Sequence, residues 1–111
     1  MTKDDHKSVR RTVLQKGDVP GTECEAVMGI SELAPNGQID RESHPGLEQG
    51  YVLEGSATLS LQGQPPLTLK PGQSWKLPPS AVHEFRAGPK GVKVLAAWVV
   101  EKKKPFASPA S

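Results

Sequence analysis

Two stretches, residues 42–55 (ESHPGLEQGYVLEG) and residues 72–83 (GQSWKLPPSAVH), decide how the rest of the chain is interpreted. Each carries a histidine beside a turn signal: His44 stands just before Pro-Gly, and His83 follows Pro-Pro-Ser-Ala-Val. The two histidines are far apart in the chain, so only tertiary folding can join them. An antiparallel barrel achieves this when it places their strands side by side.

Carboxylates flank the first of these histidines. Side chains alternate with period two on an extended backbone, so Glu42 and His44 share a face, and the turn that follows allows Glu48 to return to it. Two imidazoles with carboxylates are donors that a divalent transition metal accepts. Taken alone, each residue is also explained as a hydrogen-bonded or solvated side chain. Together on one face, they would bury several polar groups, which costs free energy unless those groups are paired.

Short apolar runs surround these stretches and are interrupted by Gly, Pro or Asn at intervals of about eight to twelve residues, as in a sandwich or barrel. No window of helical length carries a sustained apolar stripe free of Pro and Gly. We therefore predict an all-β fold, with strands at residues 11–15, 24–33, 38–42, 50–53, 57–62, 67–70, 74–77, 82–86 and 92–101. Turn residues predict chain reversals, and so sequential antiparallel pairing, at 35–37, 54–56, 63–66, 71–72 and 87–89.

The first stretch resembles the first sequence motif of the cupin family, whose pattern is His-x-His, three or four residues, Glu, six residues and Gly. His44, Glu48 and Gly55 match this pattern in spacing. Glu42 stands where the pattern has its first histidine. This departure bears on the chemistry of the site.

The second stretch resembles the second cupin motif, whose pattern is Gly, five residues, Pro-x-Gly, two residues and His. Gly72, Pro78 and His83 match it, and Ser80 replaces the motif glycine. The resemblance runs over about residues 12–101. It implies a cupin fold, which is a double-stranded β-helix or jelly-roll, an antiparallel β-barrel.

In cupins the four motif positions bind a metal ion inside the barrel, and the resemblance implies this role for Glu42, His44, Glu48 and His83. If Glu42 is a ligand, which we favour, two carboxylates balance a divalent ion and weaken it as a Lewis acid. This donor set favours Fe or Mn, with Ni, Zn and Co possible. If Glu42 points away, the other three form the two-histidine, one-carboxylate set of non-haem Fe(II) oxygenases. A barrel that binds an organic ligand without a metal is a further alternative.

Other side chains are candidates for the surroundings of this site. Aromatic residues that line the cavity, or else belong to an ordinary core, are Tyr51, Trp75, Phe85 and Trp98. Polar residues that meet an anionic ligand, or else lie exposed on the rim, are Arg41, Gln49 and Arg86. The sequence has no Ser-His-Asp arrangement, no phosphate-binding Gly loop and no Cys-x-x-Cys, which disfavours nucleophilic catalysis.

At 111 residues the chain has the length of one domain. We divide it into a flexible N-terminal arm at residues 1–11, which contains His6, a barrel at 12–101 and a C-terminal tail at 102–111. Hydrophobic residues make up only 35%, so a shared interface would enlarge a thin core, and we expect a homodimer.

Charge and cysteine content exclude several classes of partner. The net charge of +2 comes from interspersed acids and bases, so we expect no nucleic acid as partner. No apolar run is long enough to span a bilayer, and we expect no membrane partner. The single Cys24 rules out a disulfide within the chain. We expect a cytoplasmic location, although a leader removed earlier would leave no trace.

A cupin fold hosts many functions, so it does not identify one. Our leading hypothesis is a metal-dependent enzyme, dioxygenase-like or related, that acts on a small oxygen-bearing molecule. The alternative is a non-catalytic module that binds or senses a small ligand, with or without metal. Beyond the four candidate ligands, no histidine remains in the barrel to transfer protons, which supports this alternative.

Overall fold

The computed structural model describes residues 9–44, 46–104 and 108–109. Within these ranges there are strands and no helix, and all paired strands are antiparallel, which confirms the predicted all-β antiparallel fold. None of this described part forms a helix long and apolar enough to cross a membrane. The strands are β1 (Val9–Asp18), β2 (Cys24–Leu33), β3 (Gln38–Ser43), β4 (Leu47–Leu61), β5 (Leu67–Leu69), β6 (Ser74–Leu77), β7 (His83–Glu101) and β8 (Ser108–Pro109).

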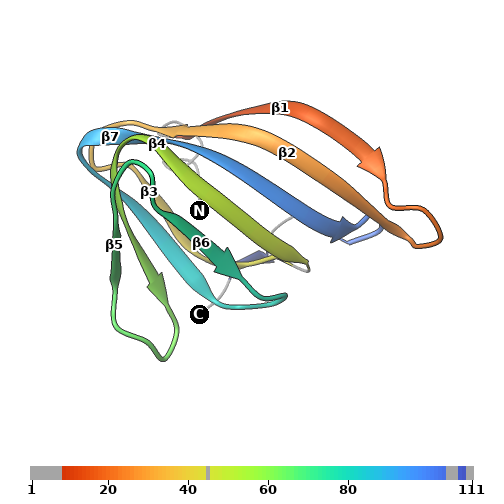
Figure 1. The fold of residues 1–111 in the computed structure, drawn as a ribbon. Helices are drawn as coiled ribbons and strands as arrows, with labels where there is room; N and C mark the ends of the chain where they lie inside the picture. The colour runs from red at the N-terminus through yellow and green to blue at the C-terminus, as the bar shows by residue number, and fades with distance from the viewer. Residues whose placement is uncertain (1–8, 45, 105–107, 110–111) are drawn as a thin grey trace.

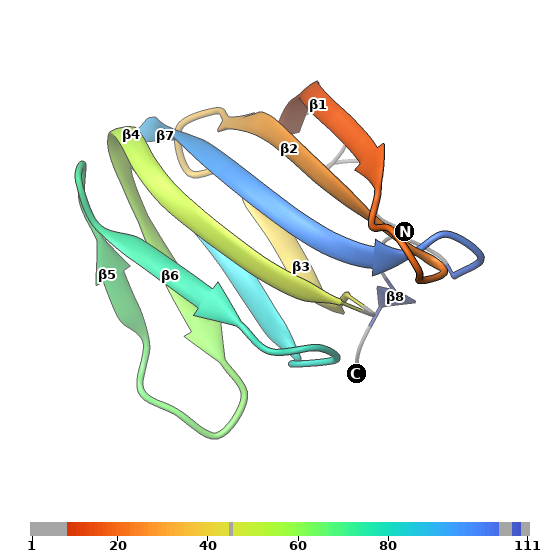
Figure 2. The ribbon, with the colours of Figure 1, turned by 45° about the vertical axis from the view of Figure 1, so that its right-hand side comes forward.

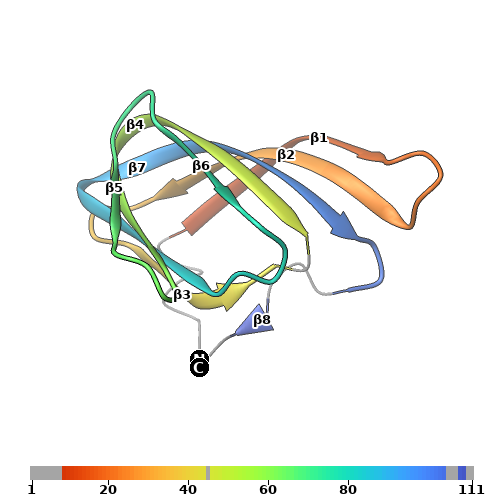
Figure 3. The ribbon, with the colours of Figure 1, turned by 60° about the horizontal axis from the view of Figure 1, so that its bottom comes forward.

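Strands β4 and β7 are paired along most of their length and belong to both layers of the structure (Figure 1). The first half of β4 pairs with the second half of β7, and the second half of β4 pairs with the first half of β7. Their neighbours divide into two layers, with strand orders β1-β2-β7-β4-β6 and β8-β3-β7-β4-β5. Figure 3 shows β3 and β8 across the interior from β1 and β2.

Alternating side chains place one face of each layer in the interior. Along β4, Glu48, Gly50 and Val52 are buried, whereas Gln49 and Tyr51 are exposed. Burial of a large apolar side chain contributes about 1.5–3 kcal/mol relative to exposure, so this face holds the layers together. The buried apolar cluster between the layers consists of Leu33, Val52, Ala57, Leu59, Leu69, Trp75, Leu77, Phe85, Ala87, Val92 and Val94.

At two of the predicted chain reversals the turn lies within a strand and not between two strands. Residues 54–56 and 87–89 lie inside β4 and β7, where the two strands bend together, and each bend joins two predicted strands into one. At the bend the backbones approach so closely that a Cβ on Gly55 would lie 2.1 Å from the carbonyl oxygen of Gly91. Gly55 also has a φ of 78°, a conformation that glycine adopts readily. Its turn signal is therefore real: the chain turns back here, as Figure 1 shows, while the strand continues through the turn.

Two further differences concern the ends of the chain. Strand β1 begins at Val9, inside the predicted arm, while His6 lies outside the described residues. Strand β8, which was not predicted, pairs Ser108 with Ser43 in β3. Two paired residues need no hydrophobic alternation of their own, so sequence periodicity could not indicate this strand. The division into arm, barrel and tail stays a prediction.

We predict that Gly55→Ala destabilises the protein more than Gly63→Ala. Both glycines have positive φ, but a Cβ on Gly63 would have no atom within 4 Å. Gly63→Ala should therefore cost only the conformational term, about 1 kcal/mol. Gly55→Ala adds the clash with Gly91 and should cost about 2 kcal/mol or more. Urea unfolding measures both, and equal costs would contradict the role of this close contact in the bend.

Candidate metal centre

Three of the predicted site residues meet where β3 and β7 pair. Glu42 lies directly opposite His83 in the register of these strands, and His44 follows the end of β3. The turn before β7 is fixed to the same place, because the backbone N–H of Ser80 donates a hydrogen bond of 2.7 Å to the carbonyl of His44. Ser80 has a φ of 66°, which explains why a glycine suits this motif position. The two sequence motifs are thus joined through their turns.

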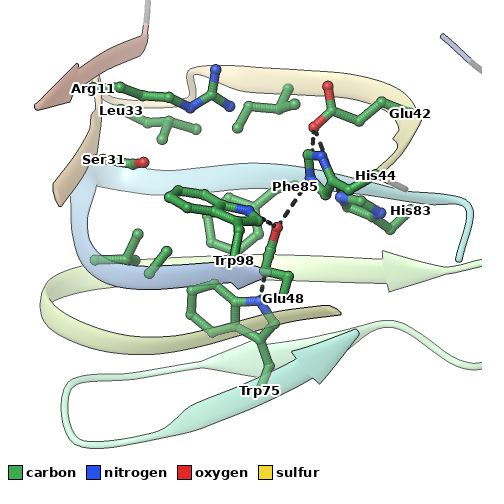
Figure 4. A pocket seen from close by; sticks show the side chains of 13 residues that line it. Arg11, Ser31, Leu33, Glu42, His44, Glu48, Trp75, His83, Phe85 and Trp98 are labelled. Atoms are coloured by element: carbon green, nitrogen blue, oxygen red, sulfur yellow. Dashed lines mark hydrogen bonds and ion pairs between the residues drawn. The ribbon is translucent and has the colours of Figure 1, made fainter. Parts of the chain in front are cut away.

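The side chains of these residues converge on one carboxylate oxygen (Figure 4). Oε2 of Glu42 lies 3.3 Å from Nε2 of His44 and 3.8 Å from Nε2 of His83. The two imidazole rings have their centroids 5.0 Å apart. Among the described residues, Glu42, His44 and His83 form a group whose candidate ligand atoms all lie within 4.8 Å of one another.

A hydrogen bond orients the ring of His83. Its Nδ1 lies 3.0 Å from the carbonyl oxygen of Ala81. A carbonyl can only accept, so Nδ1 carries the hydrogen in this pair, and in the neutral ring Nε2 keeps its lone pair. That lone pair is the one on the side of Glu42, which is the tautomer that a metal ligand requires.

The fourth predicted residue, Glu48, is held by two tryptophans (Figure 4). The indole N–H of Trp75 donates to Oε2 at 2.7 Å, and the indole N–H of Trp98 donates to Oε1 at 2.8 Å. Oε1 also lies 3.0 Å from Nε2 of His44. The strand register explains this arrangement, since Trp98 lies opposite Glu48, and Trp75 lies opposite Gly50. A Cβ on Gly50 would stand 2.1 Å from the Trp75 ring, so glycine leaves the space that the indole fills.

Burial acts on both carboxylates, but its effect prevails in only one of them. Burial raises the pKa of Glu42, and the opposing positive charges of His44, Arg11 and His83 do not compensate fully. Burial would likewise raise the pKa of Glu48. There, however, hydrogen bonds from His44, Trp75 and Trp98 outweigh burial and lower the pKa below its usual range. The donors therefore keep Glu48 ionised inside the protein.

The donor set fits a divalent ion. Adjacent ligands of an octahedral ion with bonds of about 2.1 Å lie about 3.0 Å apart, and those of a tetrahedral ion somewhat farther. The separations of 3.3 Å and 3.8 Å around Glu42, and of 3.0 Å between His44 and Glu48, are close to these values. A cation would also relieve the cost of burying two carboxylates. The residues that could hold it are Glu42, His44 and His83, with Glu48 beside them.

A pocket between the layers opens onto this group and has an empty volume of about 400 Å³, its mouth included. Three predicted aromatic residues, Trp75, Phe85 and Trp98, line it, whereas Tyr51 is 45% exposed on the other face of β4. The remaining wall is mainly apolar and comes from Leu33, Ile39, Val94 and Ala96. The pocket is thus shaped for a small molecule beside the candidate metal centre.

The polar residues predicted to meet a ligand lie elsewhere. Arg41, Gln49 and Arg86 do not line the pocket, and Arg86 instead donates a hydrogen bond to Gln38 on the surface. The polar lining that sequence analysis missed is Arg11 of β1 and Ser31 of β2. Alternation gives the face of each strand but not its cross-strand partner, so nothing in the sequence indicated that these two side chains point into the pocket.

The family is established by comparison of the sequence with known protein families. The cupin domain family matches residues 29–99, and the chain belongs to this family. The resemblance inferred from the two motifs is thereby confirmed. A comparison with curated proteins finds no match.

Solved structures with the same fold include enzymes. The DMSP lyase DddQ from Ruegeria pomeroyi matches with a TM-score of 0.82 and 18% identity, over 99% of this chain and 55% of that one. A double-stranded β-helix protein from Klebsiella pneumoniae matches with a TM-score of 0.73 and 20% identity, over 94% of this chain and 85% of that one. Oxalate oxidase in complex with the substrate analogue glycolate matches with a TM-score of 0.69 and 20% identity, over 91% of this chain and 54% of that one. This chain spans about half the length of the lyase and the oxidase, and at these identities the likeness shows the fold alone.

We predict that the indole donors of Trp75 and Trp98 stabilise the protein through Glu48. Trp98→Phe removes a donor from a buried carboxylate and should cost about 2 kcal/mol. In a Glu48→Leu background the same change should cost less, with a coupling energy of about 1–3 kcal/mol in a double-mutant cycle. Trp75→Phe should behave alike. Urea unfolding of the single and double variants measures these energies.

Phe85→Leu is the matched control for this cycle. Phe85 packs against Trp75, with ring centroids 5.4 Å apart, and offers no hydrogen-bond donor. The loss of unfolding free energy caused by Phe85→Leu should be nearly the same with Glu48 present and in the Glu48→Leu background. Coupling as large as that of the tryptophans would mean that packing, and not the indole hydrogen bonds, links these residues to Glu48.

Proposed function

We propose that this cupin is a metal-dependent enzyme that acts on a small oxygen-bearing molecule in the pocket between its layers. The observation that carries the proposal is the convergence of the two imidazole Nε2 atoms on Oε2 of Glu42, within 3.3 Å and 3.8 Å. Buried histidines and a carboxylate gathered at the end of an apolar pocket form a constellation typical of a metal site.

The four predicted ligands take unequal parts in this proposal. Glu42, His44 and His83 form the core of the site, because their ligand atoms are already grouped. Glu48 completes the set through Oε1, the oxygen closer to His44. A carboxylate oxygen can accept more than one interaction, so the indole of Trp98 does not block this role. The two tryptophans instead fix where that oxygen lies.

Two carboxylates with two imidazoles favour Fe or Mn, and Ni, Zn and Co are the other candidates. Such an ion, when bound, polarises a coordinated oxygen or, as Fe, supplies redox chemistry with O₂. The protein residues bind the ion on one side and present an apolar wall on the other, which excludes water from the ligand. A dioxygenase-like reaction fits this arrangement. The DMSP lyase and oxalate oxidase among the structural neighbours are examples of enzymes built on this fold.

One observation favours a second candidate, a module that binds or senses a small ligand without turnover. Apart from the proposed ligands, the only charged side chain among the residues that line the pocket is Arg11. An arginine does not exchange protons near neutral pH, and Glu48 is held in its ionised form. Oxygen uptake and product analysis with the metal-loaded protein distinguish the two, since a binding module binds its ligand and leaves it unchanged.

We also propose a homodimer. The outer strand β1 exposes Val13 and Leu14, at 62% and 46%, along an edge of the layer, and unpaired edges invite pairing with another chain. Nucleic acid and membrane remain unexpected partners, and a cytoplasmic location stays a prediction.

We predict that the protein, purified without a metal-affinity tag, binds about one divalent ion per chain with the proposed ligands. His44→Ala, His83→Ala and Glu42→Gln should each weaken binding by about 100-fold or more, because each removes a core donor. Glu48→Gln should weaken binding less, by about tenfold, because its carboxylate is shared with the tryptophans. Mass-spectrometric metal content and competition with a chelator measure these effects.

Glu84→Gln is the matched control, because Glu84 is adjacent to His83 on β7 but on the other face of the strand. It should leave metal content and affinity unchanged. Metal binding that survives His83→Ala, or that Glu84→Gln reduces equally, would contradict the proposed centre.

A further inference from the structure

We propose that Arg11 and Ser31 form a carboxylate-binding subsite, so that the ligand of this pocket is a small organic carboxylate. Its carboxylate lies at these two residues, and its oxygen-bearing end faces the candidate metal centre. The orientation and the positive charge balance that favours an anion rest on the proposed function, whereas the placement of the two residues rests on side chains that line the pocket.

The register of β1 and β2 places these two residues together. Arg11 lies directly opposite Ser31, so their side chains project from the same face of the pair. Both line the pocket that contains Glu42, His44 and His83. Figure 4 shows Arg11 and Ser31 on the side of the pocket opposite the two histidines, with the apolar wall between them.

Ser31 is a buried polar residue that lacks a protein partner. Its relative exposure is 5%, and no residue in the described part of the chain forms a hydrogen bond with its hydroxyl. The hydroxyl oxygen does not belong to the enclosed polar atoms without a partner in the described residues, so it is open to the pocket, where water or a ligand oxygen can reach it. Ser31 thus offers a hydrogen-bonding group to a ligand at this point.

The charge of the pocket with a bound ion favours an anionic ligand. The pocket is lined by Arg11 and by two carboxylates, and a divalent ion bound by Glu42 and Glu48 would leave its charged groups with an overall positive balance. A guanidinium presents two parallel N–H groups that match the two oxygens of a carboxylate. The hydroxyl of Ser31 offers an additional donor to the same group.

An outer cavity adjoins the proposed subsite. This cavity, with an empty volume of about 790 Å³ including open solvent, shares Arg11, Ser31 and Trp98 with the inner pocket. It lies along β1, β2 and the end of β7, the part of the sheet that extends past β4 and β6 in Figure 2. Its charged lining residues are Arg11, Lys16, Lys102 and Lys104 against Glu25 and Glu101. Lys16 pairs with Glu25 at 3.8 Å, Lys104 pairs with Glu101 at 3.2 Å, and Lys102 pairs with Asp18 at 3.1 Å, so these lysines are compensated and the cavity adds little attraction of its own.

The inner pocket limits the size of the ligand. Its empty volume of about 400 Å³ includes open solvent at the mouth, so the enclosed part is small and suits only a small ligand. Apolar residues such as Leu33 and Val94 face this middle part, which suits a short hydrocarbon segment. The class of ligand that combines these features is a short-chain carboxylate with a second oxygen function, such as a hydroxy acid.

Calorimetric binding of 2-hydroxybutyrate and of its neutral amide tests this proposal. The Mn-loaded protein should bind the acid at least about tenfold more tightly than the amide. Arg11→Gln should abolish this preference, Arg11→Lys should keep part of it because the charge remains, and Ser31→Ala should weaken the acid severalfold. Arg10→Gln is the matched control, because Arg10 is adjacent on β1 but pairs with Glu32 at 3.0 Å on the other face.

Several results would overturn the subsite: no binding of the acid, no preference over the amide, the same loss with Arg10→Gln, or tighter binding of inorganic phosphate. A change of metal content in Arg11→Gln with an unchanged acid preference would also overturn it, because Arg11 would then act only on Glu42. The same titrations on chelator-treated protein separate this proposal from the previous one. An Arg11-dependent preference without any metal binding would refute the metal centre and keep the subsite.

Discussion

The long pairing of β4 with β7, interrupted only by register shifts at the bend, is the constraint on which the rest of the structure depends. These strands are paired from Leu47 opposite Val99 to Leu61 opposite His83, and they bend together at Gly55 and Gly91. The bend divides one ladder between two layers and turns the two ends of each strand into the same interior. The start of β7 then brings His83 close to Glu42 of β3, while the start of β4 brings Glu48 against Trp98.

The cost of burying charge at this place is met by specific partners. Two carboxylates and two imidazoles lie between the layers, where an unpaired charge would cost several kcal/mol. Glu48 is compensated by two indole donors, and Nε2 of His44 lies 3.0 Å from its Oε1. Glu42 has no such set of donors, and its pKa is raised by burial. This asymmetry makes Glu42 the carboxylate that gains most from a cation, and it fits the proposed division between a core ligand and a completing one.

Sequence reasoning found most of the fold, and three of its four candidate ligands, Glu42, His44 and His83, lie grouped in the structure, because both have local signals. Strand alternation and turn residues gave β2 and β6 with their observed bounds, and the spacing of the cupin motifs selected the residues that the structure brings together. What it missed depends on pairing across strands. Gly55 marks a turn, as its signal predicts, but β4 continues through this turn because the backbone of Gly55 packs closely against Gly91. Arg11 and Ser31 share the pocket only through the register of β1 and β2, which no local pattern encodes.

The most direct test of the central claim is a crystal structure of the Mn-loaded protein, with the ion located by its anomalous scattering. We predict one ion between the two layers, bound by Nε2 of His44, Nε2 of His83 and a carboxylate oxygen of Glu42, with Glu48 still accepting hydrogen bonds from Trp75 and Trp98. An ion bound elsewhere, or a site in which His44 and His83 do not contact it, would contradict the account.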